Sequence, residues 1–268
     1  MSLPVAALIM LVTAALSAVV MLIVRRRAPA GTYFKDAVPA GAVYTVAGTG
    51  YIVILAFVFF VAFESYHSAK AAAQDEATAT QAMFDDAELL SPKARDQLQG
   101  GLICYARAVI ADEWPVMRQG KSSPVVDARL AALQDGFERV SLRDGKQRAA
   151  FDHWFVLNSA RGAGREVRIS EAAPLVPPII WLILIVGGGL VIAAVCFFAD
   201  KEEAALPQVA MIASVAVIVV SSLLLVQFLD KPYENQNGSI KPTAMMRSLA
   251  LMQSEHQRSS PNAAVPCS

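Results

Sequence analysis

Residues 42–63 read AVYTVAGTGYIVILAFVFFVAF, a run of 22 residues without Asp, Glu, Lys or Arg. An α-helix of about 20 apolar residues is long enough to cross the hydrocarbon core of a bilayer. Residues 2–24, 179–199 and 209–229 are further stretches of similar length with no charged side chain. The sequence therefore predicts four membrane-spanning helices and a partnership with the lipid bilayer.

The charged side chains are concentrated between the second and third of these stretches. Of the 268 residues, 55% are hydrophobic and 17% are charged, whereas soluble domains average about 25% charged. Residues 64–178 hold 14 of the 23 Lys and Arg and 16 of the 23 Asp and Glu. We therefore predict an all-α fold, in which four transmembrane helices form two hairpins with an inserted extramembranous helical bundle.

This pattern divides the chain into four segments. They are a first transmembrane hairpin (1–63), the helical bundle (64–178), a second transmembrane hairpin (179–229) and a polar, partly disordered C-terminal tail (230–268). A cleaved signal peptide is the alternative for residues 2–24. This stretch has no charged residue before it and is followed by arginines. A signal peptide has the reverse arrangement, with its positive charges before the apolar region.

Apolar side chains in the bundle recur at helical spacing. Leu98, Leu102 and Tyr105 follow an i, i+4, i+7 pattern on a helix that should end near Trp114-Pro115. A second stripe comprises Val126, Leu130, Leu133, Phe137 and Val140, and a weaker one includes Trp154. We expect these stripes to bury one another, because none would persist alone in water.

The sequence argues against several functional classes. Zero net charge, without an extended basic run, is atypical of nucleic-acid binding. No nucleotide-binding or hydrolase motif is present, so we expect neither an enzyme nor a cofactor. Cys104, Cys196 and Cys267 lie far apart and do not have the spacing of a zinc site, so we expect no metal; whether Cys104 pairs with Cys267 stays open at this point.

The end of the second span carries the candidate pore-lining residues. Phe57, Phe60 and Glu64 are spaced i, i+3, i+7 and share one helix face. In a ring of subunits, such phenylalanines could form a constriction that water wets poorly, with Glu64 as a charged ring beside it. The simpler interpretation is that the rings pack or face lipid and that the carboxylate meets water.

Residues in and around the bundle give the chain a resemblance to a known family. The pattern comprises a Tyr, a Glu-Trp-Pro followed by a Gly, arginines and a Pro before a Trp-bearing span, and Asp-x-Pro-aromatic followed by a Gly after the fourth span. The matching positions are Tyr105, Glu113, Trp114, Pro115, Gly120, Arg161, Arg165, Arg168, Pro178, Trp181, Asp230, Pro232, Tyr233 and Gly238. In these positions the chain resembles the bestrophin-like domain family of mainly bacterial membrane proteins.

The resemblance implies a function and a location. The family is named for its similarity to bestrophins, which are pentameric anion channels with four membrane helices and long cytosolic helices. It therefore implies a self-associating channel for small anions in the bacterial inner membrane. The alternative is a non-transporting membrane sensor or scaffold that uses the helical domain. The sequence departs from bestrophins in having no acidic calcium clasp.

The distribution of basic residues around the spans indicates a second departure from bestrophins, which concerns the orientation in the membrane. With the N-terminus outside, the short cytoplasmic segments carry five basic residues, which are Arg25, Arg26, Arg27, Lys35 and Lys201. The reverse orientation leaves Lys231, Lys241 and Arg247 inside. Because basic residues favour the cytoplasmic side, we expect the N-terminus and the helical bundle to be extracytoplasmic.

Overall fold

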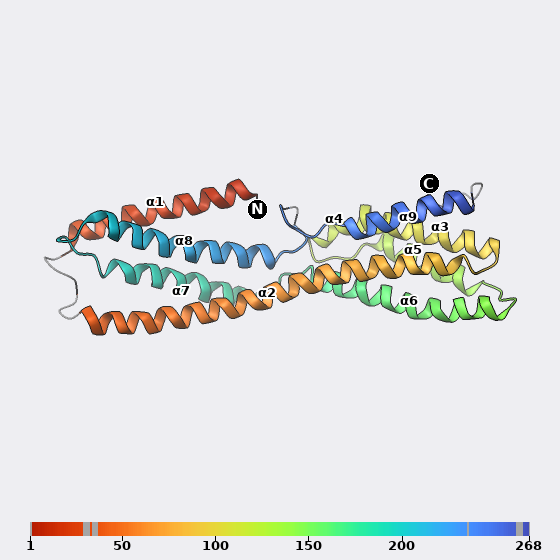
Figure 1. The fold of residues 1–268 in the computed structure, drawn as a ribbon, viewed down its shortest axis with the longest axis horizontal. Coiled ribbons are helices and arrows are strands. Elements are labelled where there is room, and N and C mark those ends of the chain that lie inside the picture. The colour runs from red at the N-terminus through yellow and green to blue at the C-terminus, as the bar shows by residue number, and fades with distance from the viewer. Residues whose placement is uncertain (1, 29–32, 34–36, 235, 261–264, 268) are drawn as a thin grey trace. The chain divides into compact units, whose positions relative to one another are not determined.

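The computed structural model describes residues 2–28, 33, 37–234, 236–260 and 265–267, and this part of the chain is helical and contains no strand. The helices are α1 (Leu3–Arg27), α2 (Ala37–Ala87), α3 (Pro92–Ala108), α4 (Trp114–Met117), α5 (Pro124–Glu138), α6 (Gly145–Ser170), α7 (Pro178–Cys196), α8 (Ala205–Leu229) and α9 (Thr243–Ser259), with a π-helix, η1 (Val109–Glu113), between α3 and α4 (Figure 1). The all-α class predicted from the sequence is confirmed.

The chain divides into two compact units. Unit 1 comprises Met1–Ser65, Pro174–Asp230 and Asn235–Gly238, and unit 2 comprises Tyr66–Ala173, Lys231–Glu234 and Ser239–Ser268. Unit 1 thus holds α1, α7, α8 and the first part of α2. Unit 2 holds the second part of α2 together with α3 to α6 and α9.

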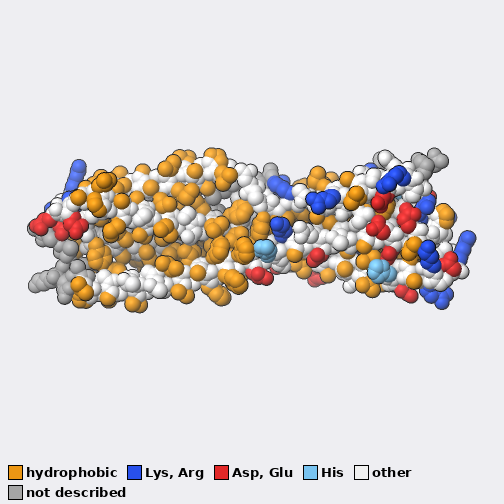
Figure 2. All heavy atoms as spheres, in the orientation of Figure 1, with side chains coloured by type: hydrophobic (Ala, Val, Ile, Leu, Met, Phe, Trp, Pro, Cys, Tyr) orange, Lys and Arg blue, Asp and Glu red, His pale blue; other side chains and the backbone are white. Residues whose placement is uncertain are grey.

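Unit 1 contains the apolar helices. α1, α2, α7 and α8 are each long and apolar enough to cross a membrane, as the sequence predicted. Hydrophobic side chains predominate over the visible surface of this unit, with Lys, Arg, Asp and Glu only near its ends, whereas these charged side chains are spread over unit 2 (Figure 2). Outward-facing apolar side chains are what a lipid environment favours, because the bilayer interior solvates them as well as a protein core does.

The four apolar helices do not pack simply in chain order. In unit 1, α1 packs against α8, and α7 also packs against α8. The pairing of α1 with α2 as one hairpin therefore stays a prediction.

Glycines on α7 allow it to approach α2 closely. A Cβ atom on Gly187 would lie 2.8 Å from the ring of Tyr51, and one on Gly188 would lie 2.8 Å from the Tyr51 hydroxyl and 2.7 Å from Val219 of α8. Without those atoms, Tyr51 lies across the glycines and is buried. This is the small-residue packing that membrane helices use.

Unit 2 has a core made from the predicted stripes. Leu98, Leu102, Tyr105, Val126, Leu133, Phe137 and Trp154 are buried, and Leu130 is partly buried against them. The Phe137 ring stacks on Phe151 at 4.2 Å and on Trp154 at 5.0 Å between centroids. Helices α5 and α6 are thereby joined by aromatic packing.

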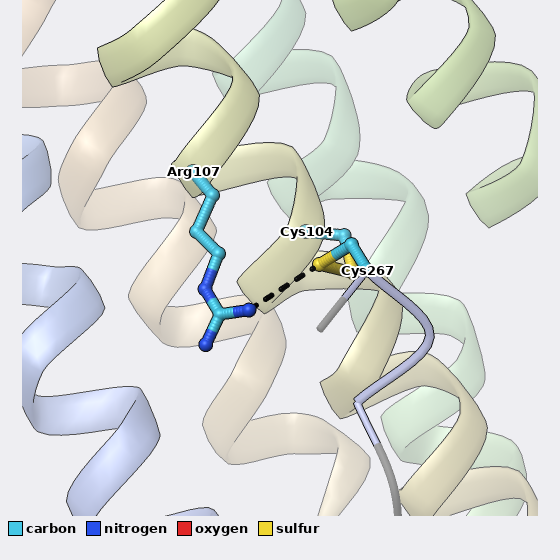
Figure 3. The surroundings of a disulfide bond; sticks show 3 residues. All are labelled: Cys104, Arg107 and Cys267. Atoms are coloured by element: carbon cyan, nitrogen blue, oxygen red, sulfur yellow. Dashed lines mark hydrogen bonds between the residues drawn. A yellow bond between two sulfur atoms is a disulfide. The ribbon is translucent and has the colours of Figure 1, made fainter.

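The C-terminal segment, expected to be a polar and partly disordered tail, contains helix α9. Its buried side chains Met245, Met252 and His256 lie on one face, and α9 packs against α3. Beyond it, Cys267 forms a disulfide with Cys104 of α3, with the Cα atoms 5.7 Å apart (Figure 3). The guanidinium of Arg107 donates to the Cys267 sulfur at 3.7 Å. Residues 261–264 lie outside the described part of the chain.

Candidate functional site

The predicted pore residues lie on an uncovered face of α2. The side chains of Phe57 and Phe60 are 69% and 62% exposed, and Glu64 is exposed as well. The opposite face of α2, which includes Leu55 and Val58, is buried within unit 1. Most of the surface of both rings is therefore uncovered within one copy of the described chain.

The same face extends along most of the span. Val43, Val46 and Val53 are exposed and continue the helical spacing of Phe57, Phe60 and Glu64 toward the N-terminal end of α2. We call these six residues the α2 face. It is apolar over its whole length and ends in one carboxylate.

Unit 2 contains a second candidate site, a buried ionic network. Glu76 of α2 accepts two hydrogen bonds from Arg168 of α6, from Nε at 2.5 Å and from Nη2 at 3.0 Å. Both side chains are essentially inaccessible to solvent. Arg168 also donates to Glu113 at 2.6 Å, so one guanidinium joins two buried carboxylates.

Glu113 is the second centre of this network. Arg165 donates to both carboxylate oxygens of Glu113, from Nη2 at 2.5 Å and from Nε at 3.1 Å. Its Nη2 also donates to Asp127 at 2.7 Å. The backbone N–H of Ser123 donates to Glu113 as well, at 3.2 Å. Glu113 thus holds α6 and the start of α5 to the end of η1.

Tyr105 extends the network to a third arginine. Its hydroxyl donates to Glu76 at 2.5 Å and accepts a hydrogen bond from Arg161 at 3.1 Å. Charge-assisted hydrogen bonds of this kind are stronger than neutral ones. The buried ionic network therefore comprises Glu76, Tyr105, Glu113, Arg161, Arg165 and Arg168.

Local sequence explains how these groups meet. Arg161, Arg165 and Arg168 share one face of α6, and Gly164 lies among them. A Cβ on Gly164 would lie 2.8 Å from the backbone nitrogen of Glu76, so the glycine lets α6 approach α2 backbone to backbone. The π-helix η1 ends at Glu113, immediately before Trp114-Pro115. Pro115 has no backbone N–H to donate, as a residue inside an α-helix would.

Electrostatic interactions keep the Glu113 carboxylate ionised and the Tyr105 phenol neutral. Burial acts to raise the pKa of Glu113, but hydrogen bonds from Arg165 and the charge of Arg168 outweigh it and hold this pKa below its ordinary value of 4.5. Burial and the nearby charge of Glu76 raise the pKa of Tyr105 well above its usual range. The stability that ionised Glu113 provides is therefore present above about pH 4.5 and is lost as the pH falls through its lowered pKa.

The remaining motif residues have structural contacts. The Trp114 ring lies over the Arg168 guanidinium at 5.2 Å and meets Tyr233 edge to face. The Pro232 carbonyl accepts from the backbone N–H of Ile240 at 2.8 Å. In unit 1, Asp230 accepts from the backbone N–H groups of residues 175 and 176, both at 2.8 Å, just before α7 begins. In the described part of the chain, no group of three or more His, Cys, Asp or Glu is placed to hold a metal ion.

Comparison with known proteins identifies the family. Residues 11–245 match the family model described as the Bestrophin-like domain. The chain belongs to the bestrophin-like family. No curated protein matches it in sequence.

Solved structures share the fold of this bestrophin-like chain. A variant of a bacterial bestrophin homologue from Klebsiella pneumoniae superposes with a TM-score of 0.66 at 14% identity, covering 91% of this chain and 98% of that one. A second variant of that homologue gives 0.61 at 14% identity, with 92% and 96% covered. A crystal structure described as a membrane protein gives 0.65 at 14% identity, with 91% and 98% covered. At this identity the likeness establishes the fold.

Sequence reasoning missed Glu76, which is the centre of the buried ionic network. This carboxylate lies within an alanine-rich run, on the helix face that buries Ala69, Ala72 and Ala73. A single acidic residue on a stripe of small, buried side chains was the available signal, because a buried carboxylate requires a cationic partner. Its partner Arg168 is 92 residues away along the chain.

Proposed function

We propose that the protein is a homo-oligomeric anion channel whose subunits meet around the α2 face. The observation that carries this proposal is the exposure of Phe57 and Phe60 in line with Glu64. The resemblance to bestrophins, which are pentameric anion channels, supports it. One subunit has too little interior to enclose a pore, so a closed ring of identical subunits is required.

Cross-linking of cysteine variants tests this assembly. In a Cys196→Ser background, Phe60→Cys should give covalent dimers on mild oxidation in the membrane, because equivalent positions face one another around the axis. The matched control is Leu182→Cys, since Leu182 is similarly exposed on α7 of the same unit. Equal cross-linking of both variants, or none at Phe60→Cys, would contradict a ring centred on α2.

We also propose that unit 2 lies on the extracytoplasmic side of the inner membrane. Arg25, Arg26 and Arg27 form the last turn of α1, and Lys201 follows α7. The proposed orientation puts these two helix ends in the cytoplasm, which is the side that basic residues favour. Lys35 lies outside the described residues. The Cys104–Cys267 disulfide gives separate support, because disulfides persist in oxidising compartments such as the bacterial periplasm.

A fusion at the C-terminus tests this orientation. Alkaline phosphatase attached after the last residue should be active, and a fluorescent protein attached there should stay dark. The unfused protein, denatured without reductant, should react with a thiol reagent at Cys196 alone. An inactive phosphatase together with three reactive thiols per chain would reverse the orientation and match the cytosolic arrangement of bestrophins.

The sensor or scaffold remains the alternative function. It is favoured by one feature of the sequence, namely that the four apolar stretches contain no Asp, Glu, Lys, Arg or His. Ionisable residues within spans commonly mark ion or proton pathways. Absence of ion flux from a protein that is folded and correctly oriented would favour this alternative.

A further inference from the structure

Unit 2 contains a small recess between α5 and α6. Its volume is about 260 Å³, and its lining comprises Leu130, Ala131, Leu133, Gln134, Trp154, Asn158 and Arg161. Three of these side chains, Leu130, Leu133 and Trp154, form an apolar wall. Arg161 and Asn158, one turn apart on α6, supply the polar groups.

Arg161 enters this recess with hydrogen-bonding capacity to spare. Its side chain is buried, with the whole residue 6% exposed. A guanidinium has five N–H donors. Nε and Nη2 donate to the Asn158 carbonyl oxygen at 3.1 Å and 3.0 Å, and Nη1 donates to Tyr105 at 3.1 Å. Three donors are thus used, and one remains on each terminal nitrogen.

The partners of Arg161 are neutral, unlike those of its neighbours. Arg165 and Arg168 each contact carboxylates directly. Among the described residues, no carboxylate lies within ion-pair distance of Arg161, and Glu76 is reached only through the Tyr105 hydroxyl. A buried charge is unfavourable unless an opposite charge compensates it. The recess therefore has the electrostatic character of an anion site.

The amide of Asn158 adds a further donor. Because its carbonyl oxygen accepts from Arg161, its NH₂ group points away from the guanidinium and is available to a ligand. The amide nitrogen of Gln134 donates one of its two N–H groups to Glu138 at 3.0 Å, so one N–H of Gln134 is left. Positive charge and donors thus gather at one end of the recess, and hydrocarbon lines the other.

We propose that this recess binds a small monocarboxylate, with its carboxylate on Arg161 and Asn158 and its short hydrocarbon tail against Leu130, Leu133 and Trp154. A planar carboxylate matches the two free N–H groups of the guanidinium better than a spherical halide does. The volume of about 260 Å³ is below that of ordinary drug-sized pockets, about 300 Å³ or more, and leaves room for a small ligand with a short hydrocarbon tail. The site is independent of the proposed channel function.

Titration calorimetry of the full-length protein in detergent, with sodium butyrate as the probe, tests this site. We expect one site per chain and at least tenfold weaker binding of chloride at equal ionic strength. Arg161→Gln should weaken butyrate binding at least tenfold, while Arg129→Gln, a partly exposed arginine of α5 outside the recess, should leave it unchanged.

A second variant separates loss of binding from loss of folding. Leu130→Phe enlarges a partly buried wall residue and leaves Arg161 intact, so it should abolish butyrate binding while the helical content is retained. Equal affinity for chloride and butyrate would show that the recess does not recognise the hydrocarbon tail of butyrate, and would overturn the proposal. Butyrate binding that is absent in the wild type, or unchanged in both Arg161→Gln and Leu130→Phe, would overturn the site. None of these outcomes depends on ion flux, so the channel proposal can fail or succeed separately.

Discussion

Arg168→Met is expected to lower the midpoint of thermal unfolding of the purified protein by on the order of 10 °C, because it removes the partner of two buried carboxylates. Breaking a buried ion pair by deleting one member costs about 3–5 kcal/mol, since the remaining charge stays buried without compensation. Glu76 would lose both ion-pair contacts to Arg168, whereas Glu113 would keep Arg165. The measurement is loss of helical circular dichroism on heating in detergent.

A matched variant and a rescue separate this effect from general damage. Asp127 is 55% exposed and contacts Arg165 from the surface, so Asp127→Asn should change the midpoint little. Adding Glu76→Gln to Arg168→Met should recover part of the loss, because the uncompensated charge at that position is removed. Similar midpoints for Arg168→Met and Asp127→Asn would mean that the buried ionic network does not stabilise unit 2.

The second large effect concerns ion flow along the α2 face. In a ring of subunits, Phe57 and Phe60 would form an apolar collar that water wets poorly. Replacing both by Ala should widen and wet this collar, so chloride flux through reconstituted protein should rise severalfold. The matched control is Leu8→Ala with Leu11→Ala on α1, which truncates two exposed apolar side chains of the same unit. Unchanged chloride flux in the variant with both Phe57 and Phe60 replaced would mean that α2 does not line the pore.

Glu64 provides a separate electrostatic readout of the same pore. Its carboxylate adds one negative charge per subunit beside the collar, which repels anions. Glu64→Gln should therefore raise chloride flux, and the increase should be largest at low ionic strength because salt screens exposed charges. An increase that does not depend on salt would argue against an electrostatic role for Glu64.

The membrane helices and the core of unit 2 could be predicted from the sequence because their signals are local. A bilayer requires a continuous apolar run, and residues 42–63 display one directly. Leu98, Leu102 and Tyr105 are spaced so that a helix must place them on one face, and all three are buried. Helix α9 carried a similar signal in Met245, Met252 and His256, but within a largely polar segment.

Contacts between distant elements could not be predicted in this way. All four spans are apolar on every side, so periodicity does not say that α1 packs against α8. The buried ionic network needs Gly164 to bring α6 against α2 before Arg168 can reach Glu76. Likewise, the pairing of Cys104 with Cys267 depends on helix α9 returning along α3.

Chloride efflux from liposomes that contain the purified wild-type protein tests the channel proposal most directly. The proposal predicts efflux that increases with the amount of protein and exceeds that of protein-free liposomes, down an imposed chloride gradient. No efflux from wild-type protein, under conditions in which a known channel empties the same liposomes, would contradict the channel and favour the sensor or scaffold.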